Sequence, residues 1–344
     1  MRRIISRHAL PSHGSYTSVD PYFVMPFIVK GYRHVACASD CVLSSLTLSN
    51  ELANIWSHVL GALYFVFEIY RLMAQHWSWD SPVFIAEEHF PLLLQHIGCV
   101  IAMSGSTLAH VFHSQSEWHH QAWFIVDYFS ISYYCVSTAI AHYSYSRPMD
   151  PDSGAISVFS TNGYLSMALV LHLCIFISQC YVRFGLYASP FRPYVLITGY
   201  LLAYTINFLP FLSRFFSADG ERGLPSDQHH WAQFFWSFAS AVVMAVHMPQ
   251  RLAPHYLYFL HGHALMHIGM FCSVLQQRTA LRLDEHRWQL LADSATSPQP
   301  SLRAIGVVLC LHVLIGSIAG YVIAFHGINV AKIKAQSVSA EHRH

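Results

Sequence analysis

Apolar residues gather along the chain into eight long stretches, which polar or proline-bearing segments separate. A hydrocarbon core about 30 Å thick is crossed by about 20 mostly apolar residues of helix. Because a backbone in lipid must satisfy its own hydrogen bonds, stretches rich in Phe, Tyr and Val are also expected to be helical. We predict an all-α membrane protein, a bundle of seven or eight transmembrane helices at residues 54–74, 92–113, 123–145, 163–182, 191–213, 231–248, 257–276 and 304–326.

More polar segments flank and divide these stretches. Residues 1–53 are expected to form an N-terminal cytoplasmic segment, in which the aromatic run 22–27 lies along the membrane interface as a helix. Residues 277–303 are expected to be a polar loop with a short helix near 281–292, and residues 327–344 a polar tail. Since the chain starts without an apolar core of signal-peptide length, we expect the first spanning helix to direct insertion.

Composition agrees with this class and excludes others. Hydrophobic residues make up 54% of the chain and charged residues only 11%, against about 25% in soluble domains. Lys and Arg number 19 and Asp and Glu 18, so no basic excess points to a nucleic acid. The eight cysteines are scattered singly and predict no disulfide framework. The expected surroundings are the lipid bilayer.

Lys and Arg also predict an orientation, because they are enriched in cytoplasmic loops. With the N-terminus inside, eleven of the 19 fall in inside segments and eight outside. This preference rests on the five basic residues before the first span, because four arginines between residues 277 and 303 favour the opposite orientation. We predict a cytoplasmic N-terminus.

The chain holds 25 histidines, and most need no special role. The pairs His119-His120 and His229-His230 lie in polar connectors and are expected to be solvated. His263 and His267, by contrast, stand four apart in a predicted helix, where both side chains share a face and reach one metal ion. In a chain this rich in histidine such a pair also arises by chance, and His261 with His263 offers a competing spacing.

A second cluster strengthens the metal hypothesis. Ser106 and His110 end the second span and Asp127 starts the third, so by parity of crossing they lie at the same side of the membrane as His263 and His267. Three neutral imidazoles and a water form the open tetrahedral site of catalytic zinc, with a carboxylate beside the water. A carboxylate in an apolar stretch is expected to face the bundle interior; the alternative for Asp127 is a helix cap at the boundary.

Four motifs together resemble the progestin and adipoQ receptor family, over about residues 20–276 and in the family's order. They are SNELANIWSH at 49–58, STLAHVFHSQSE at 106–117, VDY at 126–128 and HGHALMH at 261–267. The sequences AIAHY at 139–143 and PQRL at 249–252 look closer to the membrane progestin receptor branch. The resemblance implies a seven-transmembrane bundle of the adiponectin receptor type, a cytoplasmic N-terminus, and an eighth C-terminal transmembrane helix at 304–326.

The resemblance also implies Zn²⁺ on His110, His263 and His267, with Asp127 contacting the zinc-bound water and Ser106 beside it. Two further motif residues, Glu51 and Asn54, are either a polar cluster at a helix start or contacts near the site. His58 is interpreted as a hydrogen-bonded histidine of the bundle rather than a fourth ligand, and His261 receives no role.

The family resemblance, together with the predicted metal site, implies three alternative functions. The first is a plasma-membrane receptor that binds a steroid or other lipid ligand and couples to an intracellular signalling protein that the sequence does not identify. The second is a ceramidase-like zinc hydrolase of lipid amides, with Asp127 as general base and Ser106 stabilising the oxyanion. The third is a purely structural zinc that pins the second and seventh helices together.

Overall fold

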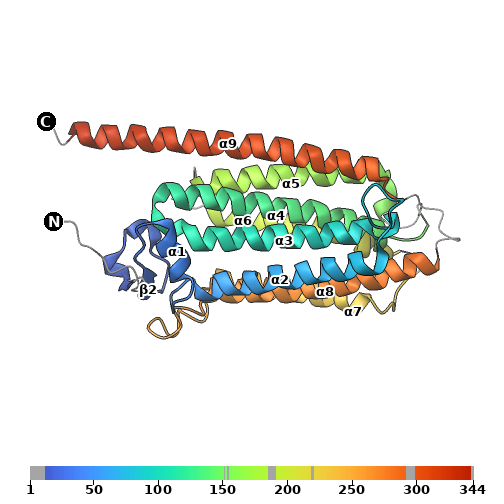
Figure 1. Ribbon diagram of the computed structural model, residues 1–344, viewed down its shortest axis with the longest axis horizontal. Coiled ribbons are helices and arrows are strands. Elements are labelled where there is room, and N and C mark those ends of the chain that lie inside the picture. The colour runs from blue at the N-terminus through green and yellow to red at the C-terminus, as the bar shows by residue number, and fades with distance from the viewer. Residues whose placement is uncertain are drawn as a thin grey trace.

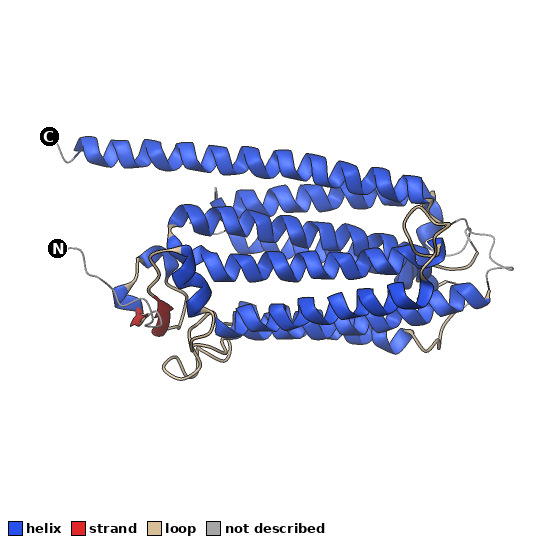
Figure 2. Ribbon diagram, in the orientation of Figure 1, coloured by secondary structure: helices blue, strands red, loops and turns tan. Residues whose placement is uncertain are grey.

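The computed structural model describes residues 12–150, 152, 155–184, 191–217, 221–291 and 299–341. Within these ranges eight long helices run side by side and account for most of the molecule (Figures 1 and 2). They are α2 (Leu52–His76), α3 (Phe90–Phe112), α4 (Glu117–Tyr145), α5 (Thr161–Phe184), α6 (Arg192–Phe215), α7 (Asp227–Ala245), α8 (Gly262–Leu290) and α9 (Leu302–Glu341).

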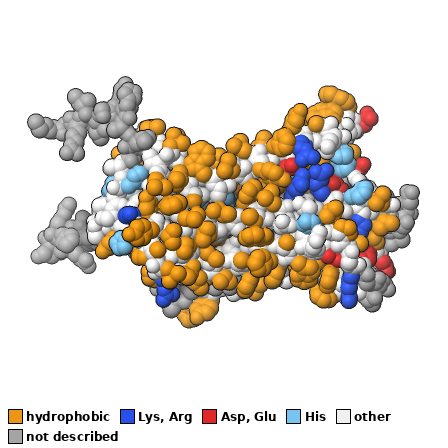
Figure 3. Space-filling model, turned by 90° about the horizontal axis from the view of Figure 1, so that it is seen from below, with side chains coloured by type: hydrophobic (Ala, Val, Ile, Leu, Met, Phe, Trp, Pro, Cys, Tyr) orange, Lys and Arg blue, Asp and Glu red, His pale blue; other side chains and the backbone are white. Residues whose placement is uncertain are grey.

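Five of these helices are long and apolar enough to cross a membrane by themselves. They include α2, α4 and the α9 portion up to Phe325, and the α3 and α5 regions at Glu87–Gln115 and Thr161–Arg183. Helices α6, α7 and α8 lie in the same bundle, and apolar side chains cover much of the face seen in Figure 3. The prediction of an all-α membrane protein is confirmed, with α9 packed against α4 and α5.

The N-terminal segment differs from its prediction. Strands β1 (His13–Ser15) and β2 (Lys30–Arg33) form an antiparallel hairpin, followed by the short helix α1 (Ala38–Ser44). The expected interfacial helix at 22–27 is wrong, because helical structure there is limited to one 3₁₀ turn at Pro21–Phe23. Short strands with no clear alternation of polar and apolar residues leave little signal in a sequence. Residues 1–11 lie outside the described residues.

Helix α8 extends further than its apolar stretch. It continues through residue 277 to Leu290, so the first half of the expected polar loop at 277–303 is helical. The charged side chains there pair inside the protein: the Asp284 carboxylate accepts a hydrogen bond from His230 at 2.8 Å and lies 3.6 Å from the Arg214 guanidinium. The expectation of a solvated His230 is therefore wrong. Helix α9 likewise continues through the predicted tail to Glu341, and residues 342–344 lie outside the described residues.

Small residues let α3 and α4 approach closely. A Cβ on Gly98 would lie 2.1 Å from the Ser137 hydroxyl, and one on Gly105 would lie 2.3 Å from that of Ser130. The two glycines are seven residues apart, as are the two serines, so both contacts lie along one seam. The seam fixes the depth of α3 relative to α4.

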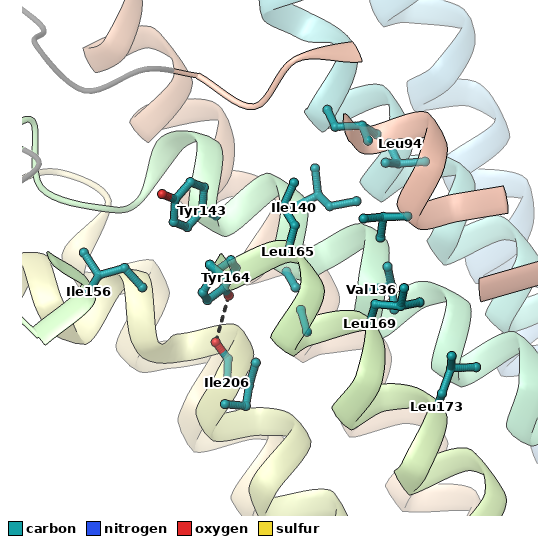
Figure 4. Packing of buried hydrophobic residues seen from close by; sticks show 14 residues of the cluster. Leu94, Val136, Ile140, Tyr143, Ile156, Tyr164, Leu165, Leu169, Leu173 and Ile206 are labelled. Carbon is teal, nitrogen blue, oxygen red and sulfur yellow. Dashed lines mark hydrogen bonds between the residues drawn. The ribbon is translucent and has the colours of Figure 1, made fainter. Parts of the chain in front are cut away.

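The main apolar cluster lies among α4, α5 and α6 (Figure 4). In this view the Tyr164 ring points toward α6, where its hydroxyl donates to the Ile206 carbonyl at 2.9 Å. Helix α9 contributes Ile305 and Val308 to this cluster, and further along the helix a Cβ on Gly316 would meet the Phe129 ring at 2.4 Å. The His312 ring also bonds the buried Ser132 hydroxyl at 2.9 Å.

Candidate metal centre

Hydrogen bonds and close packing fix the start of α8, the helix that carries His263 and His267. His261, the residue before the helix, donates from Nε2 to the Asn50 carbonyl at 2.8 Å. The Gly262 amide donates to Gln250 Oε1 at 2.7 Å, and a Cβ there would lie 2.8 Å from two backbone carbonyl oxygens. The helix therefore begins in tight contact with the chain after α7. His261, which sequence reasoning left without a role, serves this anchorage.

Helix α3 ends and α8 begins at the end of the bundle next to the N-terminal segment (Figure 1), and these helix ends carry three histidines. One nitrogen from each of His110, His263 and His267 lies within 4.8 Å of the others. The distances between ring centroids are 4.7 to 5.2 Å, with His110 and His267 buried and His263 partly buried. Side chains 153 residues apart in sequence thus share one small volume.

The donor set fits a metal ion. The Nε2 atoms of His263 and His267 are buried and have no hydrogen-bond partner in the described part of the chain. Buried polar atoms are nearly always paired, so two unpaired nitrogens on rings of the same cluster need an explanation. Imidazole nitrogens suit Zn²⁺, and three of them leave a fourth tetrahedral position open.

Glu51 orients His110 from behind. Its Oε2 lies 2.7 Å from His110 Nδ1, and Asn54 donates to the same oxygen at 2.7 Å. Because a carboxylate only accepts, Nδ1 carries the proton and Nε2 is left free as a ligand atom. A carboxylate behind a histidine is the usual arrangement around metal ligands. Both Glu51 and Asn54 therefore contact the site rather than only starting α2.

Glu51 also faces a second histidine. Its Oε1 lies 3.3 Å from His113 Nε2, and the three side chains of Glu51, His110 and His113 form a second group of close ligand atoms. Burial of Glu51, just before α2, would raise the pKa of its carboxyl. The contacts with His113 and His110 nevertheless hold that pKa well below its usual range. An ionised Glu51 is the form that holds both rings.

His58 supports a second ligand. His267 Nδ1 lies 2.8 Å from a ring nitrogen of His58, so the hydrogen bond at Nδ1 leaves His267 Nε2 for the cluster. This arrangement agrees with the interpretation of His58 as a hydrogen-bonded histidine of the bundle. Two of the three candidate ligands are therefore oriented by a neighbour.

Asp127 and Ser106 lie on the seam between α3 and α4. Asp127 is buried on α4, and neighbouring side chains include the Ser106 hydroxyl and the His110 ring. Its Oδ1 is buried without a hydrogen-bond partner among the described residues. Asp127 is not in either group of close ligand atoms. A water molecule between this carboxylate and the cluster would satisfy the unpaired oxygen.

Sequence reasoning missed two contributors. Arg33 of β2 is buried, and its Nη2 donates to the His110 carbonyl at 2.7 Å and to the Ser114 hydroxyl at 2.8 Å. It therefore caps the C-terminal end of α3, where a positive charge is favourable. No spacing in the sequence could reveal a contact with a backbone carbonyl 77 residues away. His113, three residues after His110 in the same motif, did carry a signal.

The polar connector beyond this end also packs more closely than expected. His120 lies 3.2 Å from His113, nitrogen to nitrogen, and hydrogen-bonds the Arg183 guanidinium, which covers the Phe124 ring at 3.7 Å. The expectation of a merely solvated His120 is therefore wrong. These side chains place a positive charge near the start of the spanning part of α4.

Comparison with known proteins agrees with this architecture. A family model described as haemolysin-III related matches residues 46–277. Membrane progestin receptor gamma-A of Danio rerio is 30% identical over 298 residues, covering 80% of this chain and 83% of that protein. Membrane progestin receptor delta of Homo sapiens is 34% identical over 258 residues, covering 72% and 71%. Membrane progestin receptor alpha of Homo sapiens is 28% identical over 273 residues, covering 77% and 75%.

The match with the family model includes the whole histidine cluster and the residues that orient it, from Glu51 to His267. The motifs by which the sequence resembles the progestin and adipoQ receptors lie almost entirely within the same range. The chain therefore belongs to the haemolysin-III related family, that of the progestin and adipoQ receptors.

Proposed function

We propose that this protein is a membrane receptor of the progestin and adipoQ type, with a zinc site inside the bundle. The observation that carries the proposal is the convergence of His110, His263 and His267, two of which keep buried, unpaired nitrogens. The names of the relatives support a progestin-like steroid as ligand. A steroid or another lipophilic ligand would reach the bundle from the bilayer, and would signal only by binding two states of the protein with different affinity.

Zn²⁺ would be held by these three histidines and, when bound, would act as a Lewis acid at its open position. Glu51 and His58 keep the ligand rings oriented, so the cluster needs little rearrangement to receive the ion. Asp127 accepts a proton or hydrogen bond with its unpaired Oδ1.

A second function is supported by Asp127 and Ser106. Asp127, a buried carboxylate with an unpaired oxygen, would act as a general base toward water. The Ser106 hydroxyl would donate to a developing oxyanion. These roles describe a zinc-dependent hydrolase of ceramide-like lipid amides. Hydrolysis and reception are compatible, because a product of the reaction can be the signal.

Substitution of His267 tests the metal site. We expect wild-type protein to carry about one zinc ion per chain, and His267→Ala to lose it, because two imidazoles bind the ion much more weakly than three. Elemental analysis of the purified protein measures this. His286→Ala, at an exposed histidine of the same helix, is the matched control. Full zinc occupancy in His267→Ala would exclude the proposed ligand set. Zinc loss accompanied by unfolding, with neither ligand nor substrate found, would favour a structural metal.

Steroid binding is tested in nanodiscs. We expect a radiolabelled progestin to bind the purified protein saturably, because an apolar bundle can bury the rings of the ligand. Binding to empty nanodiscs of the same lipid gives the background. A linear, unsaturable signal equal to that background would exclude the steroid as ligand and leave other lipids to be screened.

The hydrolase is tested by a change at Asp127. If the protein cleaves ceramide, Asp127→Asn should reduce turnover by about 10²- to 10⁴-fold at unchanged zinc content, because the general base is lost. Mass spectrometry of the released fatty acid measures turnover. Asp80→Asn, at an exposed aspartate, controls for the loss of a carboxylate. Equal turnover in wild type and Asp127→Asn would remove Asp127 as the base.

We further propose a plasma-membrane location with the N-terminus in the cytoplasm. The five basic residues before the first span support this orientation. Cys37, exposed in the N-terminal segment, provides the test. A membrane-impermeant maleimide should label it only after permeabilisation, and Cys37→Ser gives the background. Labelling of Cys37 in intact cells would reverse the orientation.

A further inference from the structure

Three arginines gather on the outside of the seam between α2 and α8. They are Arg71 of α2 and Arg278 and Arg282 of α8, which we call the arginine cluster. Basic side chains form a prominent patch on this face of the molecule, toward the end away from the N-terminal segment (Figure 3). None of the three belongs to the histidine cluster.

One carboxylate serves all three guanidinium groups. Glu68, buried on α2, lies 3.1 Å from Arg71, hydrogen-bonds Arg278 and lies 4.0 Å from Arg282. Three positive charges against one negative leave a net charge of +2. No other carboxylate of the described residues lies within 4.0 Å of these groups.

The cluster keeps donors for another anion. The side chains of Arg71 and Arg282 are 40% and 35% exposed, and the Nε atom of Arg278 is buried without a partner among the described residues. Each guanidinium has five N–H donors, and one carboxylate cannot occupy the donors of three. By contrast, Arg214 at the same end of the bundle has carboxylates of both Asp227 and Asp284 within 4.0 Å. On its outward side, the positive charge of the arginine cluster is therefore not balanced by carboxylates.

The arginine cluster lies at a depth in the bilayer where lipid headgroups are found. Glu68 follows Glu51 by 17 residues, which is about 25 Å of helix at 1.5 Å per residue. The hydrocarbon core is about 30 Å thick, so a group that far from the start of α2 approaches the opposite bilayer surface. Arg71 lies just over one turn before the end of α2 at His76. Arginines at this depth extend toward phosphates while their stems remain in apolar surroundings.

An apolar surface continues from the cluster toward the middle of the bilayer. Leu60, Leu63 and Phe67 of α2 are 59%, 61% and 55% exposed. These side chains offer a contact for acyl chains below the three guanidinium groups. A free phosphate ion would use only the charges, whereas a phospholipid uses both features.

We propose that the arginine cluster binds the phosphate of an anionic glycerophospholipid in the leaflet opposite the histidine cluster. Arg71, Arg278 and Arg282 supply charge-assisted hydrogen bonds, for which guanidinium and phosphate geometries match. Glu68 holds the arginines together in the absence of lipid and competes with the phosphate for their donors.

The test uses the full chain in nanodiscs of phosphatidylcholine alone or with phosphatidylglycerol. We expect phosphatidylglycerol to raise the melting temperature of the wild type and to be retained in native mass spectra. The double variant Arg278→Gln/Arg282→Gln should lose about tenfold or more of that retention. Arg303→Gln, at an exposed arginine outside the cluster, should behave as wild type. Unchanged retention in the double variant would overturn the proposal.

A second variant separates lipid binding from a purely structural ion cluster. Glu68→Gln keeps all three arginines and removes the competing carboxylate. It should be less stable in phosphatidylcholine and regain stability with phosphatidylglycerol, with stronger retention than the wild type. Loss of stability that the anionic lipid does not restore would mean that the cluster is structural only. Equal stabilisation by inorganic phosphate would overturn the lipid as source.

Discussion

A polar group inside a bilayer has no water to bond, and this constraint governs most of the bundle. Buried polar side chains accordingly find partners on other helices: Asp284 pairs with His230 and Arg214, and Ser132 links His312 to the backbone of α5. Against that rule, the buried atoms without hydrogen-bond partners are informative, among them the Nε2 atoms of His263 and His267 and the Oδ1 atom of Asp127. The two nitrogens belong to rings of the histidine cluster, so the same constraint that orders the bundle also draws attention to that cluster.

The centre depends on elements that are not part of it. Close packing of Gly105 on Ser130 sets α3 against α4, which brings the end of one helix beside Asp127 on the other. The start of α8 is held by Gly262, and the end of α3 by Arg33 from the N-terminal hairpin. The positions of the three imidazole rings thus depend on contacts between helices, on the cap at the end of α3 and on two orienting hydrogen bonds. Loss of any one of them would displace a ligand without removing it.

The sequence predicts the helices well and their limits poorly. Hydropathy locates the eight spans because burial in lipid requires about 20 apolar residues in succession, but α8 runs on past its apolar part, since Asp284 and its neighbours pair internally. The candidate ligands could be found from motif spacing and parity of crossing. The support of His110 by Arg33 could not, because Arg33 contacts backbone carbonyls and two serines that carry no pattern in the sequence. His230 was misjudged for a related reason: a polar connector in the sequence becomes a buried helix start in space.

Helix α9 covers one flank of the bundle, which bears on how a lipophilic ligand would enter it. Its glycines let it lie directly on Phe129 of α4, and Ile125 and Leu173 beneath it are almost fully covered. That flank of the protein is closed to the surrounding acyl chains. A lipophilic ligand of the kind proposed above would therefore have to enter between other helices, because α9 closes this flank of the bundle.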